Sequence, residues 1–311
     1  MDKRAALFPG QGSQQVGMGK DLCEGFEAAR ETFEEANEIL GFDLRSICFE
    51  GPDETLKQTR YTQPAIVTHS VAAWRVLSGG GFSPHYVAGH SVGEYSALVA
   101  GGVLTFADAL RLVKVRAEAM QNCGEENPGT MAAIIGMPEE KMAGLLEGAG
   151  AAGVIAAANF NSPGQTVVSG DVAAVEKAIE LAPSMGATRA IKLNVSGAFH
   201  SPLMEKSVAE LSAMFGRVEF RPARVPVVCN VTAKPSTEPR EIQDLLTRQL
   251  LSPVLWAQSI GFMIEDGVSS FAEVGPGNVL CGLLRRIDRS AGCAPCSDVK
   301  TLNEFLGGIE A

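Results

Sequence analysis

The stretch "VAGHSVGEYSALVAGG", residues 87–102, places Ser91 between two glycines where a short apolar segment meets a helical pattern. We expect a strand at 86–88 and a helix from Val92 through Val99. Gly89-His90-Ser91-Val92-Gly93 then matches the G-x-S-x-G nucleophile elbow, in which glycines relieve clashes and the serine hydroxyl stands above the sheet. The next N–H, at the helix N-terminus, can stabilise an oxyanion. A serine that only caps the helix is the alternative, and the strand before it with the helix after it favours a nucleophile.

Outward from this turn, apolar strands alternate with helices. This alternation favours an α/β fold with a mostly parallel sheet. Thr62 is the expected N-cap of one helix, with Pro64 in its first turn. Strands are expected at 5–8, 225–231 and 269–274, and helices at 21–40, 53–56, 63–77, 106–121, 202–216, 241–251, 254–266 and about 279–287.

The middle of the chain has a different order of elements. Between 129 and 196 the pattern reads strand, helix, strand, strand, helix, strand, which is typical of a ferredoxin-like unit. We therefore expect a discontinuous large domain, residues 1–127 and 196–311, of α/β-hydrolase-like type. The ferredoxin-like subdomain, residues 128–195, is inserted into it.

Composition narrows the function classes. The chain has 311 residues, of which 46% are hydrophobic, and a formal net charge of −10. An acidic chain is a poor ligand for nucleic acids or anionic membranes. No window approaches the ~18 apolar residues of a membrane span, and Pro9 interrupts the N-terminal apolar run, so we expect no signal peptide.

Seven cysteines, an odd number, suggest a reducing cytoplasm. Cys293 and Cys296 form a C-x-x-C pair, which is half of a zinc site at best. We expect two incidental thiols in a C-terminal loop and no metal.

A serine nucleophile needs a base, most often histidine. His85 lies in a loop, His69 on the flank of a helix, and His90 beside Ser91, where it is better placed to support the turn. His200 follows a strand and "SGA" and precedes a helix start at Ser201-Pro202, and such strand ends build the sites of open α/β sheets. We therefore expect His200 to be the base.

The acid of a hydrolase triad is missing from the pattern, because the carboxylates between 91 and 200 lie on helices or in the small unit. A free carbonyl at a helix C-terminus can orient a histidine instead. Residues 249–251 form such an end.

Arg116 lies in the middle of the apolar face of the helix at 106–121, among residues such as Leu112, Val113 and Met120. A buried charge is costly unless it is paired. One interpretation is a salt bridge within the chain. The other is a bidentate contact with the free carboxylate of an acyl substrate.

Motifs along nearly the whole chain resemble the malonyl-CoA:acyl carrier protein transacylase family of bacterial type II fatty-acid synthesis. The acyltransferase domains of polyketide synthases share the pattern. The matching stretches are "FPGQGSQQVGMG" (8–19), "TQPAI" (62–66), "GHSVGEYSAL" (89–98), "VRAEAMQ" (115–121), "NFNSPGQTVVSG" (159–170), "VSGAFHSPLM" (195–204), "RQLLSPVLW" (248–256) and "EVGPGNVL" (273–280).

The resemblance implies a role for each matching residue. Ser91 would carry the malonyl group as an ester, His200 would be base and then acid, and Arg116 would pair with the malonyl carboxylate. The N–H groups of Gln11 and Val92 would form the oxyanion hole. The remaining residues that it implies are the Gln249 carbonyl, which would hold the histidine, Gln63 and Asn161 near the site, and Phe199 for malonyl selectivity.

It also implies the partners malonyl-CoA and holo acyl carrier protein, a ping-pong scheme, a cytoplasmic monomer, and no metal or redox cofactor. Carrier proteins are usually acidic, so five basic residues are candidate docking charges or simply solvated surface: Arg189, Lys192, Arg285, Arg286 and Arg289. The alternatives are a trans-acting polyketide synthase acyltransferase, an esterase or thioesterase, and a scaffold without activity.

Overall fold

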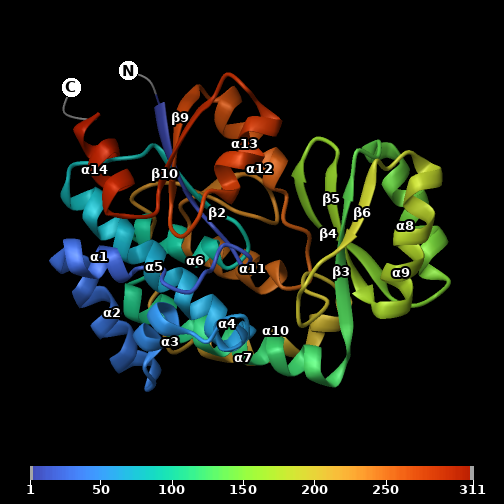
Figure 1. Cartoon of the computed structure of the whole chain (residues 1–311), viewed down its shortest axis with the longest axis horizontal. Coiled ribbons are helices and arrows are strands. Elements are labelled where there is room, and N and C mark those ends of the chain that lie inside the picture. Colours follow the sequence, from blue (N-terminus) through green and yellow to red (C-terminus); the bar gives the residue numbers. More distant parts are fainter. Residues whose placement is uncertain (1–2, 309–311) are drawn as a thin grey trace.

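The structure, a computed structural model, describes residues 3–308 and contains two β-sheets (Figure 1). The larger sheet has six strands in the order β10-β9-β1-β2-β7-β8. Strands β10 to β7 pair in parallel, and β8 is an antiparallel strand at the edge. The bounds are β1 (Lys3–Phe8), β2 (Tyr86–Gly89), β7 (Val227–Val228), β8 (Pro235–Ser236), β9 (Val268–Val274) and β10 (Gly292–Cys296).

Helices cover both faces of this sheet, because β1 is apolar on both sides. Ala6 and Phe8 belong to one apolar core, and Ala5 and Leu7 belong to the other. The second core is covered by α12 (Trp256–Glu265) and α13 (Val279–Ile287). The first is covered by α1 (Lys20–Gly25), α2 (Glu27–Leu40), α3 (Leu44–Glu50), α4 (Asp53–Leu56), α5 (Thr59–Gly79), α6 (Gly93–Ala100), α7 (Phe106–Glu126), α10 (Glu205–Phe215), α11 (Pro239–Gln249) and α14 (Val299–Gly307).

The smaller sheet is antiparallel, with strands in the order β4-β5-β3-β6. Alternate residues of β3 face opposite ways, as the pleat requires: Ala132 and Ile134 pack under the helices, whereas Met131 and Ala133 join the first core. Its elements are β3 (Gly129–Ile135), α8 (Met142–Gly150), β4 (Ile155–Ser162), β5 (Gln165–Asp171), α9 (Val172–Leu181) and β6 (Arg189–Lys192), with 3-10 turns at Glu139–Lys141 and Ala182–Met185.

One stretch of backbone ties the two sheets together beside the site. The Val254 N–H donates to the Ala158 carbonyl of β4 (2.8 Å), and the Phe160 N–H of β4 donates to the Val254 carbonyl (2.9 Å). Leu255 then donates to the Asn230 carbonyl (2.9 Å) next to β7. The edge of the small sheet is thus held by the segment that follows α11.

Several expected boundaries were wrong. The helix at 21–40 is two helices, α1 and α2, because Phe26 adopts an extended backbone between them. Helix α5 begins at Thr59, so Thr62 is not its N-cap; the Thr62 hydroxyl donates to the Leu56 carbonyl instead. Pro64 lies inside α5, where it removes one N–H of the early helix. The expected helix at 202–216 is a 3-10 turn, Pro202–Met204, followed by α10.

The C-terminal region also differs from expectation, since the segment expected as a loop is strand β10 and is followed by α14. Pro295 argued against a strand in the sequence, because proline lacks the N–H that a central strand needs. A proline is tolerated on an edge strand, which β10 is. Helix α14 begins with a capping box between Asp298 and Thr301.

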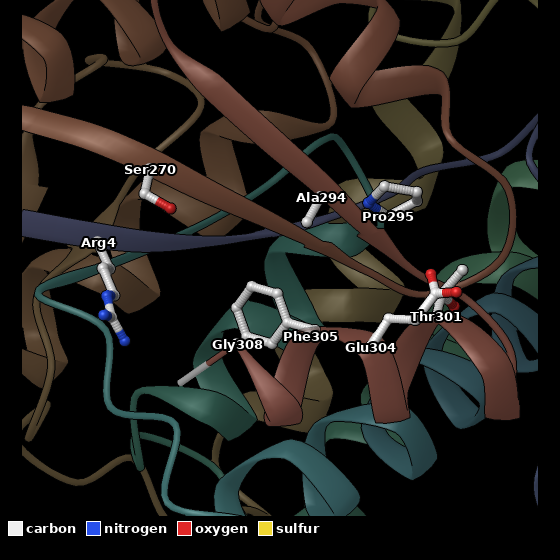
Figure 2. A pocket seen from close by; sticks show the side chains of 8 residues that line it. All are labelled: Arg4, Ser270, Ala294, Pro295, Thr301, Glu304, Phe305 and Gly308. Atoms are coloured by element: carbon white, nitrogen blue, oxygen red, sulfur yellow. The ribbon is translucent and has the colours of Figure 1, made fainter. Parts of the chain in front are cut away.

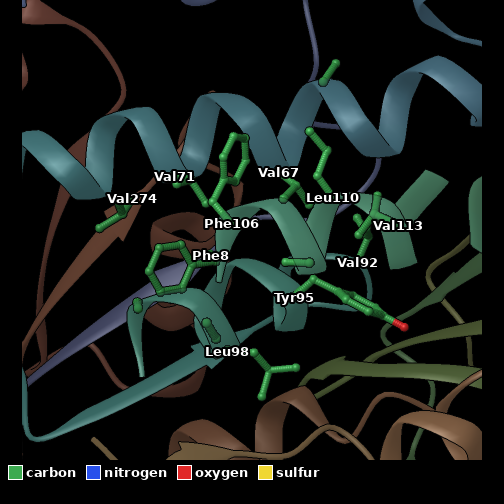
Figure 3. Packing of buried hydrophobic residues seen from close by; sticks show 14 of the residues in the cluster. Phe8, Val67, Val71, Val92, Tyr95, Leu98, Phe106, Leu110, Val113 and Val274 are labelled. Atoms are coloured by element: carbon green, nitrogen blue, oxygen red, sulfur yellow. The ribbon is translucent and has the colours of Figure 1, made fainter. Parts of the chain in front are cut away.

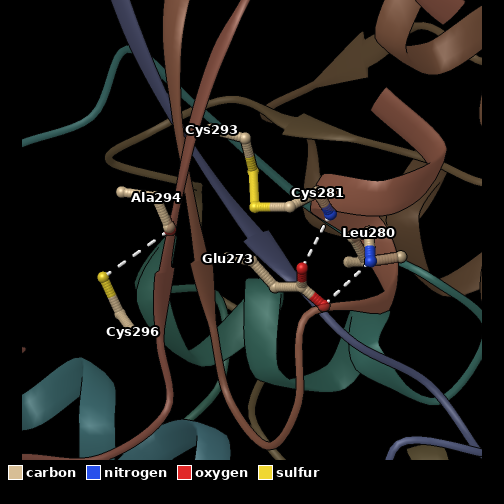
Figure 4. Close-up of a disulfide and its surroundings, with 6 residues drawn as sticks. All are labelled: Glu273, Leu280, Cys281, Cys293, Ala294 and Cys296. Atoms are coloured by element: carbon tan, nitrogen blue, oxygen red, sulfur yellow. Dashed lines mark hydrogen bonds between the residues drawn. A yellow bond between two sulfur atoms is a disulfide. The ribbon is translucent and has the colours of Figure 1, made fainter. Parts of the chain in front are cut away.

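The interpretation of Cys293 as an incidental thiol was wrong. Its sulfur is bonded to that of Cys281 on α13, with the Cα atoms 5.4 Å apart (Figure 4). Cys296 remains a buried free thiol. Residues three apart on a strand face opposite sides, so the C-x-x-C spacing cannot bring Cys293 and Cys296 together.

A large hollow lies away from the elbow, at the edge of the larger sheet between β10 and α14 (Figure 2). It measures about 500 Å³ and is lined by residues such as Arg4, Ser270 and Phe305. None of the residues expected in the site lines it. Among the helices that the structure describes, none combines the length and apolarity needed to cross a membrane.

Candidate active site

Ser91 lies at the sharp turn between β2 and α6, with φ at +52°. A non-glycine residue in this left-handed region is strained, and such residues cluster at functional sites. A side chain on Gly89 would collide with the backbone of Gly93, and one on Gly93 would collide with the Phe8 carbonyl. Val92 and Tyr95 anchor the following turn in the first core (Figure 3). The elbow expected from the sequence is therefore present.

His200 faces this serine. Its Nε2 lies 2.7 Å from the Ser91 Oγ, and its Nδ1 lies 2.9 Å from the backbone carbonyl of Gln249, the last residue of α11. The carbonyl can only accept, so Nδ1 carries the proton and Nε2 is the acceptor for the serine hydroxyl. Burial, assisted by the Arg116 charge, lowers the pKa of His200 to about 3. The imidazole is therefore neutral at physiological pH, as a base must be.

Arg116 is fully buried and has no carboxylate within ion-pair distance among residues 3–308. The salt-bridge interpretation was therefore wrong. Its Nη1 donates to the Gln63 Oε1 (2.6 Å), and its Nη2 donates to the Gln249 Oε1 (3.1 Å) and to the Ser91 Oγ (3.2 Å). Its Nε has no hydrogen-bond partner in the described part of the chain. A buried cation that is held only by neutral groups, as Arg116 is beside Ser91, is suited to binding an anion.

A cavity of about 100 Å³ is lined by Ser91 and His200, whereas the buried Arg116 lies behind its lining. Gln11 and Val92 line it, and the backbone N–H groups of both make no hydrogen bond within residues 3–308. Gln63 and Phe199 line it too, as expected. The cavity thus combines apolar walls with free N–H donors next to Ser91, which is the requirement of an oxyanion hole.

Asn161 does not line this cavity. It lines an adjoining cavity of about 190 Å³, and its Oδ1 lies 2.8 Å from the His90 Nε2. His90 thereby supports the turn, as expected. His69 is buried, and His85 accepts a hydrogen bond from the Arg4 N–H.

Sequence reasoning missed two residues beneath the elbow. The Asn230 Oδ1 accepts from the Ser91 N–H (2.8 Å), and its Nδ2 donates to the Gly89 carbonyl (2.6 Å). Glu94 is 1% exposed, and its Oε2 accepts from the Gln249 Nε2 (2.6 Å). The sequence did indicate Glu94, because it is a charged residue in an otherwise apolar helix. A buried charge needs a partner, by the same argument as for Arg116. Asn230 carried no such signal.

One group of three potential metal ligands exists in the part of the chain that the structure describes: Glu273, Cys281 and Cys293. The two sulfurs are bonded to each other, and the Glu273 carboxylate accepts from the backbone N–H groups of Leu280 and Cys281 (Figure 4). The ligand atoms are thus engaged within the protein.

Acyl transfer through a serine would require a hydroxyl beside a neutral imidazole and N–H donors at the same cavity, which is the arrangement around Ser91. The family model described as "Acyl transferase domain" matches residues 6–303, and the chain belongs to this family.

Individual relatives are more specific. The malonyl CoA-acyl carrier protein transacylase of Bacillus subtilis (strain 168) is 44% identical over 303 residues, 97% of this chain and 96% of that protein. The solved malonyl CoA-acyl carrier protein transacylase of Coxiella burnetii has a TM-score of 0.95 at 37% identity, covering 98% of this chain and 97% of its own. A malonyl-transacylase solved in complex with a type II PKS acyl-carrier protein has a TM-score of 0.95 at 40% identity, covering 98% and 99%. Within the acyl transferases, the chain belongs with the malonyl CoA-acyl carrier protein transacylases.

Proposed function

We propose that this protein moves a malonyl group from malonyl-CoA to the phosphopantetheine thiol of an acyl carrier protein through an ester on Ser91. The observation that carries the proposal is the contact of one hydroxyl with both a base and a cation. The Ser91 Oγ lies 2.7 Å from the His200 Nε2 and 3.2 Å from the Arg116 Nη2. The names and near-complete coverage of its relatives support the same reaction.

In the first half-reaction, His200 takes the Ser91 proton as Oγ attacks the thioester carbonyl. The N–H groups of Gln11 and Val92 receive the oxyanion, since both are free at the cavity. Collapse of the intermediate breaks the C–S bond, and the imidazolium returns the proton to the departing coenzyme A sulfur. The Gln249 carbonyl stabilises the imidazolium through Nδ1.

The second half-reaction reverses these roles. The carrier thiol gives its proton to His200 and attacks the ester, and Ser91 leaves with that proton restored. An acid is unnecessary behind the imidazole, because the carbonyl at the end of α11 fixes its tautomer.

Arg116 selects the acyl group in this proposal. Its Nε has no hydrogen-bond partner among the described residues, and the neutral amide of Gln63 on Nη1 is a weaker partner than a carboxylate. Phe199 lines the small cavity at Ser91, whose size favours an unbranched malonyl group.

Docking of an acidic carrier protein is proposed at the basic residues near α13. Arg189 and Arg286 line one hollow of about 440 Å³, and the Arg286 Nη1 donates to the Gln165 Oε1 (2.5 Å). Gln165 also lines the cavity that adjoins the site. Lys192 is a weaker candidate because it pairs with Glu176 (2.9 Å).

We also propose the division of the chain into a discontinuous α/β-hydrolase-like domain, residues 1–127 and 196–311, and a ferredoxin-like subdomain, residues 128–195. The order of elements from β3 to β6 and the sheet order β4-β5-β3-β6 support it.

A polyketide carrier protein is the second candidate acceptor, because one solved neighbour is bound to a type II PKS acyl-carrier protein. The chemistry is the same for both carriers, and competition between the two holo proteins for malonyl-Ser91 distinguishes them.

The direct test is an intact mass spectrum after mixing with malonyl-CoA, with Ser91→Ala as the control. We expect a malonyl-sized gain in the wild type only, discharged by holo acyl carrier protein. Steady release of malonate without a carrier would indicate a thioesterase instead, and a Ser91→Ala protein that still transfers malonyl would exclude the nucleophile.

A further inference from the structure

Glu94 is a buried carboxylate that the reaction scheme does not use. It lies in the first turn of α6, one turn after Ser91, and is 1% exposed. A buried carboxylate is retained at a large desolvation cost. Its hydrogen bonds therefore indicate what it does.

The first contact of Glu94 is with the side chain of Gln249. The Gln249 Nε2 donates to the Glu94 Oε2 (2.6 Å) and to the Ser91 carbonyl (3.2 Å), while its Oε1 accepts from the Arg116 Nη2 (3.1 Å). An amide has one donor end and one accepting end. The carboxylate at the donor end thus forces the oxygen to face the guanidinium. A flipped amide would set oxygen against carboxylate and NH2 against guanidinium.

The second contact of Glu94 is with the Asn230 N–H (3.3 Å). The Asn230 side chain holds the Ser91 N–H and the Gly89 carbonyl. The Glu94 carboxylate thus accepts hydrogen bonds from Gln249 and from Asn230, which lie in different segments of the chain. It therefore links the two residues that hold the backbone of the elbow.

The position of the anion explains how Arg116 stays available. A carboxylate in direct contact with Arg116 would form an ion pair and compete with the substrate carboxylate. At one amide's distance, Glu94 offsets the buried positive charge through the field. The Nη groups then donate only to neutral oxygens, those of Gln63, Gln249 and Ser91.

We propose that Glu94 is a positioning residue for acyl selection: through the Gln249 amide it orients Arg116 toward the substrate carboxylate without pairing with it. This inference rests on the proposed malonyl transfer.

The pH dependence offers a readout that a purely structural role would not give. Burial raises the pKa of Glu94 to about 7, against the opposing effects of the Gln249 amide, the Asn230 N–H and Arg116. The other titratable groups that face this cluster are Tyr95, Cys229 and His200. Burial raises the pKa of Tyr95 and of Cys229, and it lowers that of His200 to about 3. Arg116 stays cationic. Near pH 7, Glu94 is therefore the group of this cluster that titrates.

The experiment measures single-turnover acylation of Ser91 by quenched mass spectrometry with two donors. Malonyl-CoA carries a carboxylate, and p-nitrophenyl acetate does not. The variants are Glu94→Gln, Gln249→Leu and the matched control Glu273→Gln, which removes another fully buried carboxylate that accepts from backbone N–H groups. Gln249→Leu keeps the backbone carbonyl for His200 but removes the amide.

We expect Glu94→Gln and Gln249→Leu to lower the malonyl rate about tenfold or more relative to the acetyl rate, and Glu273→Gln to leave that ratio unchanged. The wild-type ratio should fall below pH 7, and the Glu94→Gln ratio should be flat. In an Arg116→Ala background, Glu94→Gln should change the ratio no further.

The inference would be overturned if Glu94→Gln and Gln249→Leu lowered the malonyl and acetyl rates equally, or left the ratio of the two rates unchanged. Malonylation of the wild type would still support the proposed transferase in that case. If Glu94→Gln fails to fold, Gln249→Leu decides by the same ratio. Absence of malonylation in the wild type would overturn the proposed function and the inference with it.

Discussion

The His200 Nε2 lies 2.7 Å from the Ser91 Oγ, and both residues have a left-handed backbone, with φ at +58° and +52°. Neither is glycine, so each conformation is held by its surroundings. For Ser91 these are the Asn230 amide and the two glycines of the elbow, and for His200 they include the Gln249 carbonyl. The contact is thus built before substrate arrives.

Arg116→Ala should lower malonyl transfer by a factor of about 100 or more, because charged hydrogen bonds to the substrate carboxylate are lost. Acylation by p-nitrophenyl acetate should change far less. Arg116→Lys should not rescue the activity, since an ammonium cannot hold Gln63, Gln249 and a carboxylate together. Steady-state kinetics with both donors check this, and unimpaired malonyl transfer by Arg116→Ala would contradict it.

The pH profile with the carboxylate-free donor should be flat from about pH 5 to 8. An unperturbed histidine, with a pKa of about 6.5, would lose its base form below that value. Burial lowers the pKa of His200 to about 3, so the neutral imidazole persists across this range. The initial acetylation rate of Ser91 at each pH provides the measurement, and an acidic limb near 6.5 would refute the assignment of a depressed pKa.

Glu94 should make folding less favourable as the pH rises. Its folded pKa of about 7 exceeds the ordinary value of 4.5, so the folded state binds more protons between these values. The stability held below pH 4.5 is lost as the pH rises through 7. Between pH 5 and 8 the wild type should therefore lose of the order of 3 kcal/mol more free energy of unfolding than Glu94→Gln. Urea denaturation of both proteins at the two pH values tests this, and parallel pH dependences would contradict it.

Two glycines should respond oppositely to alanine. Gly93→Ala should destabilise strongly, since its Cβ would collide with the carbonyls of Phe8 and Pro9. Gly282→Ala, in the exposed part of α13 with nothing near its Cβ, should stabilise by about 0.5–1 kcal/mol. Thermal melts of the two variants check the signs, and a tolerated Gly93→Ala would show that the elbow is looser than described.

The Cys281–Cys293 bond should add about 3 kcal/mol to the free energy of unfolding, because it closes a loop with a sequence separation of 12. Alkylation in denaturant should label five cysteines without reductant and seven with it. Seven labels without reductant would mean that the bond is absent, and Cys293→Ser should then leave the stability unchanged.

The parts of the site with local signals could be predicted from sequence. Ser91 was found through the glycines around it, and Arg116 through its place on an apolar face. His200 required elimination among four histidines. The helix end that would orient the histidine was placed at 249–251 from the pattern, and the family resemblance narrowed it to the Gln249 carbonyl, since a backbone atom has no residue signature.

Other contacts had no local signal. Asn230 reaches Ser91 across 139 positions, and the Gln249 amide reaches Glu94 across 155. These two contacts depend on how α11 and the end of β7 pack against the elbow. The hydrophobic periodicity of the sequence does not reveal that packing. Cys281 and Cys293 lie on different elements, so their spacing did not predict the bond, and Pro295 concealed β10.

The backbone link between Val254 and β4 has a mechanical consequence. Both hydrogen bonds of that link are made by the backbone of residue 254. The carbonyl that binds the His200 ring belongs to residue 249, five positions earlier in the same segment. A displacement of the small sheet would therefore be transmitted through residue 254 to the segment that holds the His200 ring.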